Sequence, residues 1–185
     1  MPRDQFELIK LLGSTKYMNT NLTDGTSAID LMSGLEKYLN DRGYEVSIKY
    51  HGRQGKELGN FGKYYAGEIL NPELIRNKIL NDERMILRIG YYEHDKKEGT
   101  YKRLDGHYVT VVGFKENSQD EVYVHDPSKY SGFEPKTETF KLVPINFGNI
   151  VQYRVEGMKT APEKPDFKPD FVALDAVISF KIKWL

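Results

Sequence analysis

The sequence predicts an α+β protein with a mostly antiparallel sheet. Helical patterns come early in the chain and strand patterns come late, and the later strands follow one another through short, turn-rich links. The chain has 185 residues, including 13 Tyr and 9 Phe, which is enough bulky apolar material for the core of one ordinary domain. Lys and Arg total 27 and Asp and Glu also total 27, so a net charge of zero favours no nucleic-acid partner.

Helices are predicted where apolar residues recur at helical spacing, and their ends carry the expected capping residues. Ser27 and Asn71 are the expected N-caps of two of them, because a short polar side chain there accepts a hydrogen bond from a free backbone N–H group. Pro72 suits the first helical position, and Gly43 suits a C-terminal stop. The predicted helical segments are residues 4–14, 26–43 and 71–82.

Strands are predicted from alternating or continuous apolar runs between turn signals. The predicted strands are residues 44–50, 84–92, 106–114, 121–127, 137–143 and 150–155. Residues 93–105, EHDKKEGTYKRLD, read as a charged loop. We therefore expect one domain over residues 1–156, a Pro-rich linker over 157–170, and a terminal strand or the start of a further domain over 171–185.

A histidine and an aspartate stand at matching ends of two neighbouring predicted strands. His107 opens GHYVTVVGF and Asp126 closes EVYVHD. If the two strands form a hairpin with Phe114 opposite Gln119, His107 faces Asp126 on the sheet face that also holds four valines. Those valines are Val109, Val111, Val122 and Val124.

An imidazole beside a carboxylate is half of a nucleophilic site. The carboxylate fixes the tautomer of the ring and stabilises the imidazolium, and the other ring nitrogen is then free to deprotonate a nucleophile. A purely structural polar pair at the end of a hairpin explains the same residues equally well. A shift of the register by one residue would instead remove Asp126 from the shared face and place His125 there.

The runs GHYVTVVGF and EVYVHDPS resemble the His and Asp strands of the bacteriocin-leader (double-glycine) peptidase-like family, a papain-like group of cysteine peptidases. Upstream segments agree in order, and the similarity covers about residues 5–145. The resemblance implies a papain-like fold, with an antiparallel sheet packed against helices. It also implies that His107 is the general base and that Asp126 is its orienting partner.

The chain departs from that family at the nucleophile, because the sequence contains no cysteine. In the family the Cys begins a helix that precedes the segment matching residues 4–13, and Met1 stands almost directly before that segment. We therefore expect a peptidase-like domain that is inactive as this chain. The alternative is a non-catalytic module that binds a peptide or a leader segment in extended form.

The sequence predicts no cofactor and no metal site. The run Glu93-His94-Asp95 matches no familiar ligand spacing and is typical of a solvated loop. The partners that the sequence favours are a peptide or protein substrate and, because a missing core helix would leave an apolar sheet face uncovered, a second copy of the chain. No apolar run is long enough for a transmembrane helix, no signal peptide is recognisable, and the compartment stays open.

Overall fold

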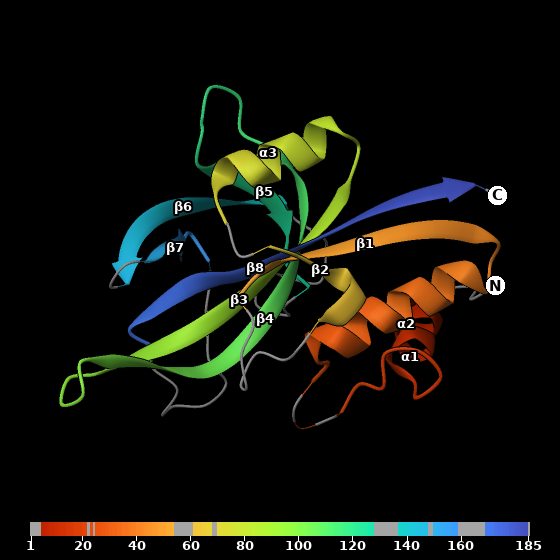
Figure 1. The fold of residues 1–185 in the computed structure, drawn as a ribbon, viewed down its shortest axis with the longest axis horizontal. Coiled ribbons are helices and arrows are strands. Elements are labelled where there is room, and N and C mark those ends of the chain that lie inside the picture. Colours follow the sequence, from red (N-terminus) through yellow and green to blue (C-terminus); the bar gives the residue numbers. More distant parts are fainter. Residues whose placement is uncertain are drawn as a thin grey trace. The chain divides into compact units, whose positions relative to one another are not determined.

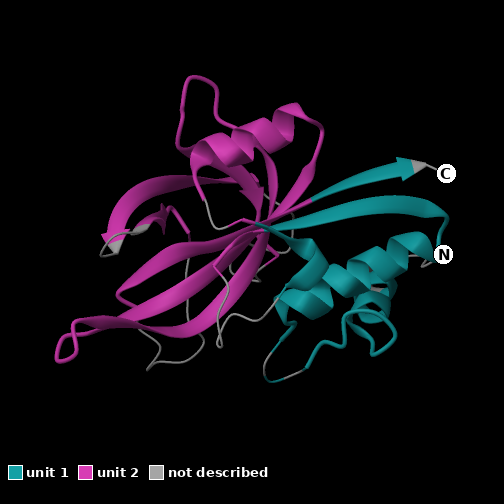
Figure 2. Ribbon diagram, viewed as in Figure 1, with its two compact units in different colours: residues 1–50, 54–66, 180–185 teal, residues 51–53, 67–179 magenta. Residues whose placement is uncertain are grey.

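A computed structural model describes residues 5–21, 23, 25–53, 61–67, 70–127, 137–147, 150–158 and 169–184. The chain divides into two compact units, coloured separately in Figure 2. Unit 1 comprises residues 1–50, 54–66 and 180–185, and unit 2 comprises residues 51–53 and 67–179. Both residues of the predicted site, His107 and Asp126, lie in unit 2.

The predicted α+β, papain-like class is wrong. Strands account for 52% of the described residues and helices for 22%, and six antiparallel strands close on themselves as a barrel. The reason lies in two segments. The predicted loop at residues 93–105 is largely strand, and the segment predicted as a terminal strand or a new domain is a central member of the sheet.

The barrel of unit 2 is built from strands that neighbour one another in the order β8-β3-β4-β5-β6-β7 (Figure 1). The pairs β3–β4, β4–β5, β5–β6, β6–β7 and β7–β8 are antiparallel, and β7 meets β8 through the pair Arg154 and Ala173, which closes the ring. The strand bounds are β3 Arg84–Asp95, β4 Thr100–Phe114, β5 Glu121–His125, β6 Thr137–Phe147, β7 Ile150–Glu156 and β8 Phe171–Trp184.

The core of unit 2 follows from the alternation of these strands. Alternate side chains point inward, and closure encloses them, so the expectation of an uncovered apolar sheet face is wrong for this unit. The homodimer was predicted from that uncovered face. It stays a prediction, but this reason for it no longer applies to unit 2. The buried inward-facing residues include Met85, Leu87, Ile89, Val109, Val111, Val122, Val124, Phe140, Leu142, Val155 and Leu174.

Helix α3, Pro72–Leu80, packs on this core through Ile75, which is fully buried. Its start was predicted correctly. Asn71 is the N-cap, its side-chain oxygen accepts a hydrogen bond of 2.6 Å from the backbone N–H of Leu74, and Pro72 is the first helical residue.

Unit 1 contains the helices α1, Gln5–Gly13, and α2, Ala28–Asn40, and most of the strands β1, Tyr44–Gly52, and β2, Tyr65–Gly67. A short 3-10 helix, Gly62–Tyr64, leads into β2. Ser27 caps α2 as predicted, because its hydroxyl accepts a hydrogen bond from the backbone N–H of Asp30. The rings of Tyr50 and Phe61 stack with their centroids 3.7 Å apart and are both buried, which anchors the interior of this unit. Among the described residues, no helix is long and apolar enough to cross a membrane.

A buried carboxylate ties β8 to the β3–β4 hairpin in unit 2. Asp175 on β8 is only 3% exposed. It accepts a hydrogen bond of 2.6 Å from the hydroxyl of Tyr92 and one of 2.8 Å from Nε of Arg103. Burial, together with the negative charge of Asp175, raises the pKa of the Tyr92 phenol. The ion pair with Arg103 opposes the unfavourable desolvation free energy of a buried carboxylate.

Gly90 makes room for this carboxylate. A β-carbon at position 90 would lie 2.6 Å from Oδ2 of Asp175 and 2.6 Å from Cε2 of Tyr92. Both distances are shorter than real side chains tolerate, so only glycine lets the Asp175 carboxylate approach β3 this closely.

We expect the substitution Gly90→Ala to lower the free energy of unfolding by about 1–3 kcal/mol, because the added methyl group must displace a buried carboxylate or its partner. The matched control is Gly113→Ala on β4, where the nearest atom to a β-carbon is Cδ2 of Tyr123 at an ordinary 3.7 Å. The control should change stability by less than about 0.5 kcal/mol. Urea denaturation of the two variants measures both values, and equal stabilities would contradict the packing described here.

Candidate functional site

The two residues predicted as a catalytic pair lie in contact. Nε2 of His107 is 2.6 Å from Oδ1 of Asp126, although 19 residues separate them in the sequence. The carboxylate side chain is 1% exposed and the imidazole 24% exposed. The carboxylate is therefore held in the interior, and one side of the ring remains accessible to solvent.

The pairing of β4 with β3 places the imidazole. His107 is opposite Ile89 on β3, and Val109 is opposite Leu87. Side chains directly opposed in a sheet share a face. Since Ile89, Leu87 and Val109 are all buried in the barrel core, His107 faces inward at the end of this apolar series.

The predicted register between β4 and β5 is wrong by two residues. Val111 is opposite Val124, where Val122 was expected, and an irregularity follows between Val111 and Gly113. Asp126 comes directly after His125, the last residue of β5, which is opposite Thr110. A shift by an even number of residues keeps every side chain on its face, so Asp126 stays on the face of His107 and reaches it diagonally.

Tyr91 and Asp105 extend this polar group. They are directly opposed on β3 and β4, two positions beyond the pair of Ile89 and His107, and so lie on the same face. The Tyr91 hydroxyl lies 3.9 Å from Sδ of Met158. Burial raises the pKa of the Tyr91 phenol to about 12, and the negative charges of Asp126 and Asp105 add to this effect.

This end of the barrel can exchange a proton and donate hydrogen bonds. If Nε2 of the neutral imidazole donates to Asp126, the lone pair of the ring lies on Nδ1, which can accept a proton or a hydrogen bond. Tyr91 keeps its proton at neutral pH because its pKa is raised, so it can act as a donor. The chain supplies no thiol for the pair to activate, since it contains no cysteine.

The sequence did not identify Tyr91 as part of this group, and it placed Asp105 in a loop. The useful signal was the alternation of Met85, Leu87, Ile89 and Tyr91, which puts the tyrosine on the apolar face of its strand. Residues 93–105 are so rich in charged side chains that the sequence did not predict the part of β4 that carries Asp105. In the structure this segment forms the outer part of the hairpin, with His94 opposite Tyr101.

His94 and His125 lie in different surroundings. His94 stacks on Tyr101, with ring centroids 4.7 Å apart, and its backbone N–H donates to Asp170. His125, next to Asp126, lies 3.3 Å through Nε2 from the hydroxyl of Thr137. Among the residues that the structure describes, no group of three or more His, Asp or Glu side chains could hold a metal ion.

Comparison with known proteins adds no relative. No protein-family model, no curated protein and no solved structure matches the chain.

The raised pKa of Tyr91 predicts a loss of stability at alkaline pH. Below about pH 10 the phenol is protonated in both the folded and unfolded states, whereas between about pH 10 and 12 only the folded state keeps the proton. The free energy of unfolding should therefore fall across this interval, and Tyr91→Phe should make the fall shallower. The contribution is smaller than for a fully buried phenol, because this side chain is partly exposed.

A second variant tests the cause of the shift. Asp105→Asn removes one of the negative charges near the phenol, so it should lower the pKa of Tyr91 in the folded state. The alkaline loss should then be smaller and end at lower pH, while its onset near pH 10 is unchanged because the unfolded state sets it. Denaturation curves recorded from pH 9 to 12 provide the measurement. Profiles of Tyr91→Phe and the unsubstituted protein that superimpose would show that the phenol is not held in this environment.

Proposed function

We propose that the protein is a thiol-peptidase-like domain that binds peptides at the His107–Asp126 pair and does not cleave them. The observation that supports this proposal is the 2.6 Å contact between a partly exposed imidazole and a buried carboxylate in a chain without cysteine. The resemblance of residues 106–114 and 121–128 to the His and Asp strands of bacteriocin-leader peptidases favours a peptide ligand over other small molecules.

The absence of hydrolysis follows from chemistry. A histidine base accelerates peptide cleavage by activating a nucleophile, and the nucleophile with its oxyanion-stabilising groups provides most of the rate. No Cys is present anywhere in the 185 residues. The pair can therefore orient a peptide and donate a proton to it, but the chain supplies no thiol for the imidazole to deprotonate.

Binding is supported by the hydrogen-bonding groups around the pair. Peptide bonds carry an N–H donor and a carbonyl acceptor. Nδ1 of His107 can accept from the former. The Tyr91 hydroxyl keeps its proton and can donate to the latter in exchange for its long contact with Sδ of Met158. Asp126 supports this arrangement indirectly, because its fixed contact with Nε2 holds the ring orientation that leaves Nδ1 available.

The experiment measures binding and cleavage with the same peptide, a leader-like sequence that ends in Gly-Gly and carries a fluorophore. Fluorescence anisotropy should give a Kd of about 1–100 μM for the unsubstituted protein. Mass spectrometry of the same mixtures should show intact peptide after prolonged incubation.

Variants assign the binding to the pair. His107→Ala should weaken binding by about tenfold or more, equivalent to about 1.4 kcal/mol. His125→Ala is the matched control, because His125 precedes Asp126 directly but its ring lies beside Thr137, and it should bind like the unsubstituted protein. Cleavage of the peptide, or equal binding by the His107→Ala variant, would refute the proposal; a purely structural His–Asp pair predicts the latter result.

A further inference from the structure

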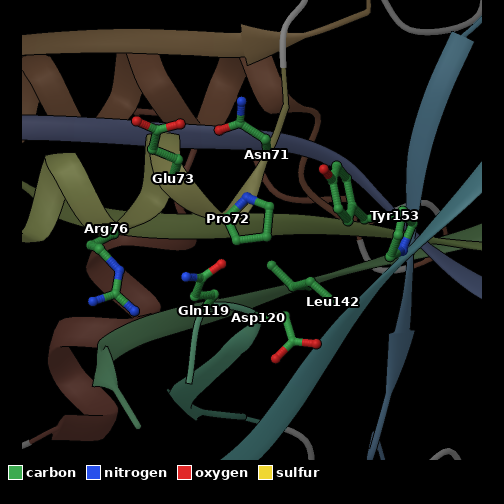
Figure 3. Close-up of a pocket in the computed structure, with 9 residues that line it drawn as sticks. Asn71, Pro72, Glu73, Arg76, Gln119, Asp120, Leu142 and Tyr153 are labelled. Carbon is green, nitrogen blue, oxygen red and sulfur yellow. The ribbon is translucent and has the colours of Figure 1, made fainter. Parts of the chain in front are cut away.

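A polar cavity lies at the end of the unit 2 barrel opposite the His107–Asp126 pair. His107 and Phe114 are at opposite ends of the inner part of β4, seven residues apart, which corresponds to about 23 Å along an extended strand. The turn that follows Phe114 borders a cavity of about 820 Å³ under the first turn of α3 (Figure 3). This volume is within the range of small-molecule sites, which often lie in the mouths of barrels.

The floor of the cavity is apolar and comes from the sheet. Leu142 and Pro144 on β6 and Tyr153 on β7 line it, and Pro144 is directly opposite Tyr153. Tyr153 also packs partly against the barrel core. An aromatic ring next to aliphatic side chains offers a surface for a hydrocarbon stem and a face for a cation.

The rim of the cavity is polar and carries more negative than positive charge. Its charged residues are Glu73, Arg76 and Asp120, and its amides are Asn71 and Gln119. Asn71 uses its side-chain oxygen to cap α3, which leaves the NH2 group as the part that can face a ligand.

The only positive charge in the lining of this cavity is already engaged within the described structure. Arg76 donates through Nη2 to the backbone carbonyl of Ser118, and its guanidinium lies 4.8 Å from the centre of the Phe114 ring. This arrangement holds the guanidinium against the β4–β5 turn. An anionic ligand would therefore be repelled by Glu73 and Asp120, because the described part of the lining offers it no cation that lacks a partner of its own.

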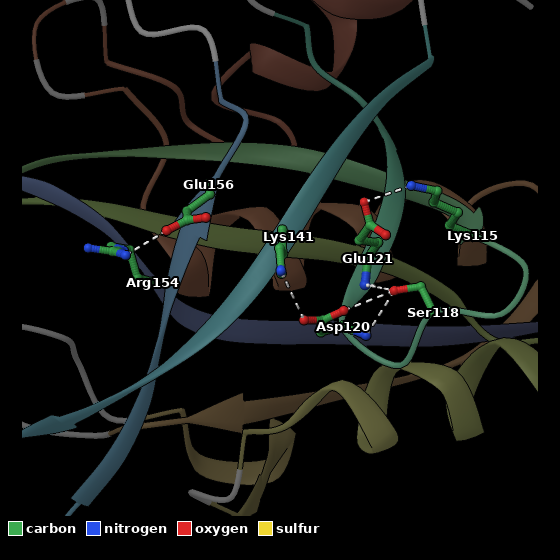
Figure 4. Close-up of polar contacts among 7 residues, drawn as sticks. All are labelled: Lys115, Ser118, Asp120, Glu121, Lys141, Arg154 and Glu156. Carbon is green, nitrogen blue, oxygen red and sulfur yellow. Dashed lines mark hydrogen bonds and ion pairs between the residues drawn. The ribbon is translucent and has the colours of Figure 1, made fainter.

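The carboxylate of Asp120 is held in place but only weakly neutralised. The hydroxyl of Ser118 donates to it at 2.9 Å, and Nζ of Lys141 lies 3.8 Å away (Figure 4). The Lys141 side chain is 52% exposed and that of Asp120 is 40% exposed, so the interaction between them is weak. Glu73 on the first turn of α3 is exposed at the same cavity.

We propose that this cavity binds the side chain of a basic residue, with the ammonium or guanidinium group between Glu73 and Asp120 and the aliphatic stem on Pro144 and Tyr153. The apolar floor matches the stem of a lysine or arginine, and the excess of negative charge on the rim matches its terminal group. The site is separate from the His107–Asp126 pair, and the proposal does not require that pair to bind a peptide.

Three probes test the chemistry of the cavity by NMR titration of the 15N-labelled full chain: Nα-acetyl-lysine amide, Nα-acetyl-arginine amide and Nα-acetyl-norleucine amide. Norleucine keeps an aliphatic stem and lacks the amine. The two basic probes should shift the amide signals of residues 73–76, 119–120 and 153, and norleucine should bind at least about tenfold more weakly. Equal binding by norleucine, or shifts by inorganic phosphate at the same residues, would overturn the proposal.

Substitutions in the rim complete the test. Glu73→Gln and Asp120→Asn should each weaken binding of the lysine probe severalfold. Glu121→Gln is the matched control, because Glu121 is adjacent to Asp120 but pairs with Lys115 at 3.0 Å and does not line the cavity (Figure 4). Equal weakening by Asp120→Asn and Glu121→Gln would show a general charge effect and contradict a site. Urea denaturation of each variant separates lost binding from lost folding.

Discussion

Closure of the antiparallel sheet in unit 2 is the constraint on which the site depends. Once β8 pairs with both β3 and β7, each strand has one face toward a common interior. The alternation of side chains along β4 then fixes the position of His107. It precedes Val109 and Val111 on the inward face and therefore lies against the inward-facing residues of the neighbouring strands. Asp126 follows Val124 on that face, and the two polar side chains come together where the apolar series ends.

Local signals in the sequence were sufficient for most of the elements and for the shared face of His107 and Asp126, but not for the strands within residues 93–105 or for the closed topology. Asn71 with Pro72 located the start of α3, and the alternation around His107 and Asp126 placed both on one face even though the assumed register was wrong by two residues. The class was wrong because the charged residues 93–105 continue two strands beyond the point where apolar alternation stops. Cross-strand pairing and the network at Asp175 stabilise them there, and neither is visible in a local pattern.

Unit 2 contains three kinds of polar group, which lie in different parts of the barrel. One end holds the His107–Asp126 pair with Tyr91, and the other opens under α3 into a cavity with a negatively charged rim. Asp175 is different: its oxygens accept from Tyr92 and Arg103, and the absence of a side chain at Gly90 is what admits it. A fully paired buried carboxylate of this kind fixes the position of β8, whereas the partly exposed groups at the two ends remain able to meet a ligand.

A double-mutant cycle on His107 and Asp126 tests whether this contact is formed, with the free energy of unfolding of His107→Ala, Asp126→Ala and the double variant measured at one pH. A hydrogen bond to a buried carboxylate predicts a coupling energy of about 1.5–3 kcal/mol between the two positions. Effects that add to within about 0.5 kcal/mol would mean that the side chains do not interact, and the account of the site would then fail.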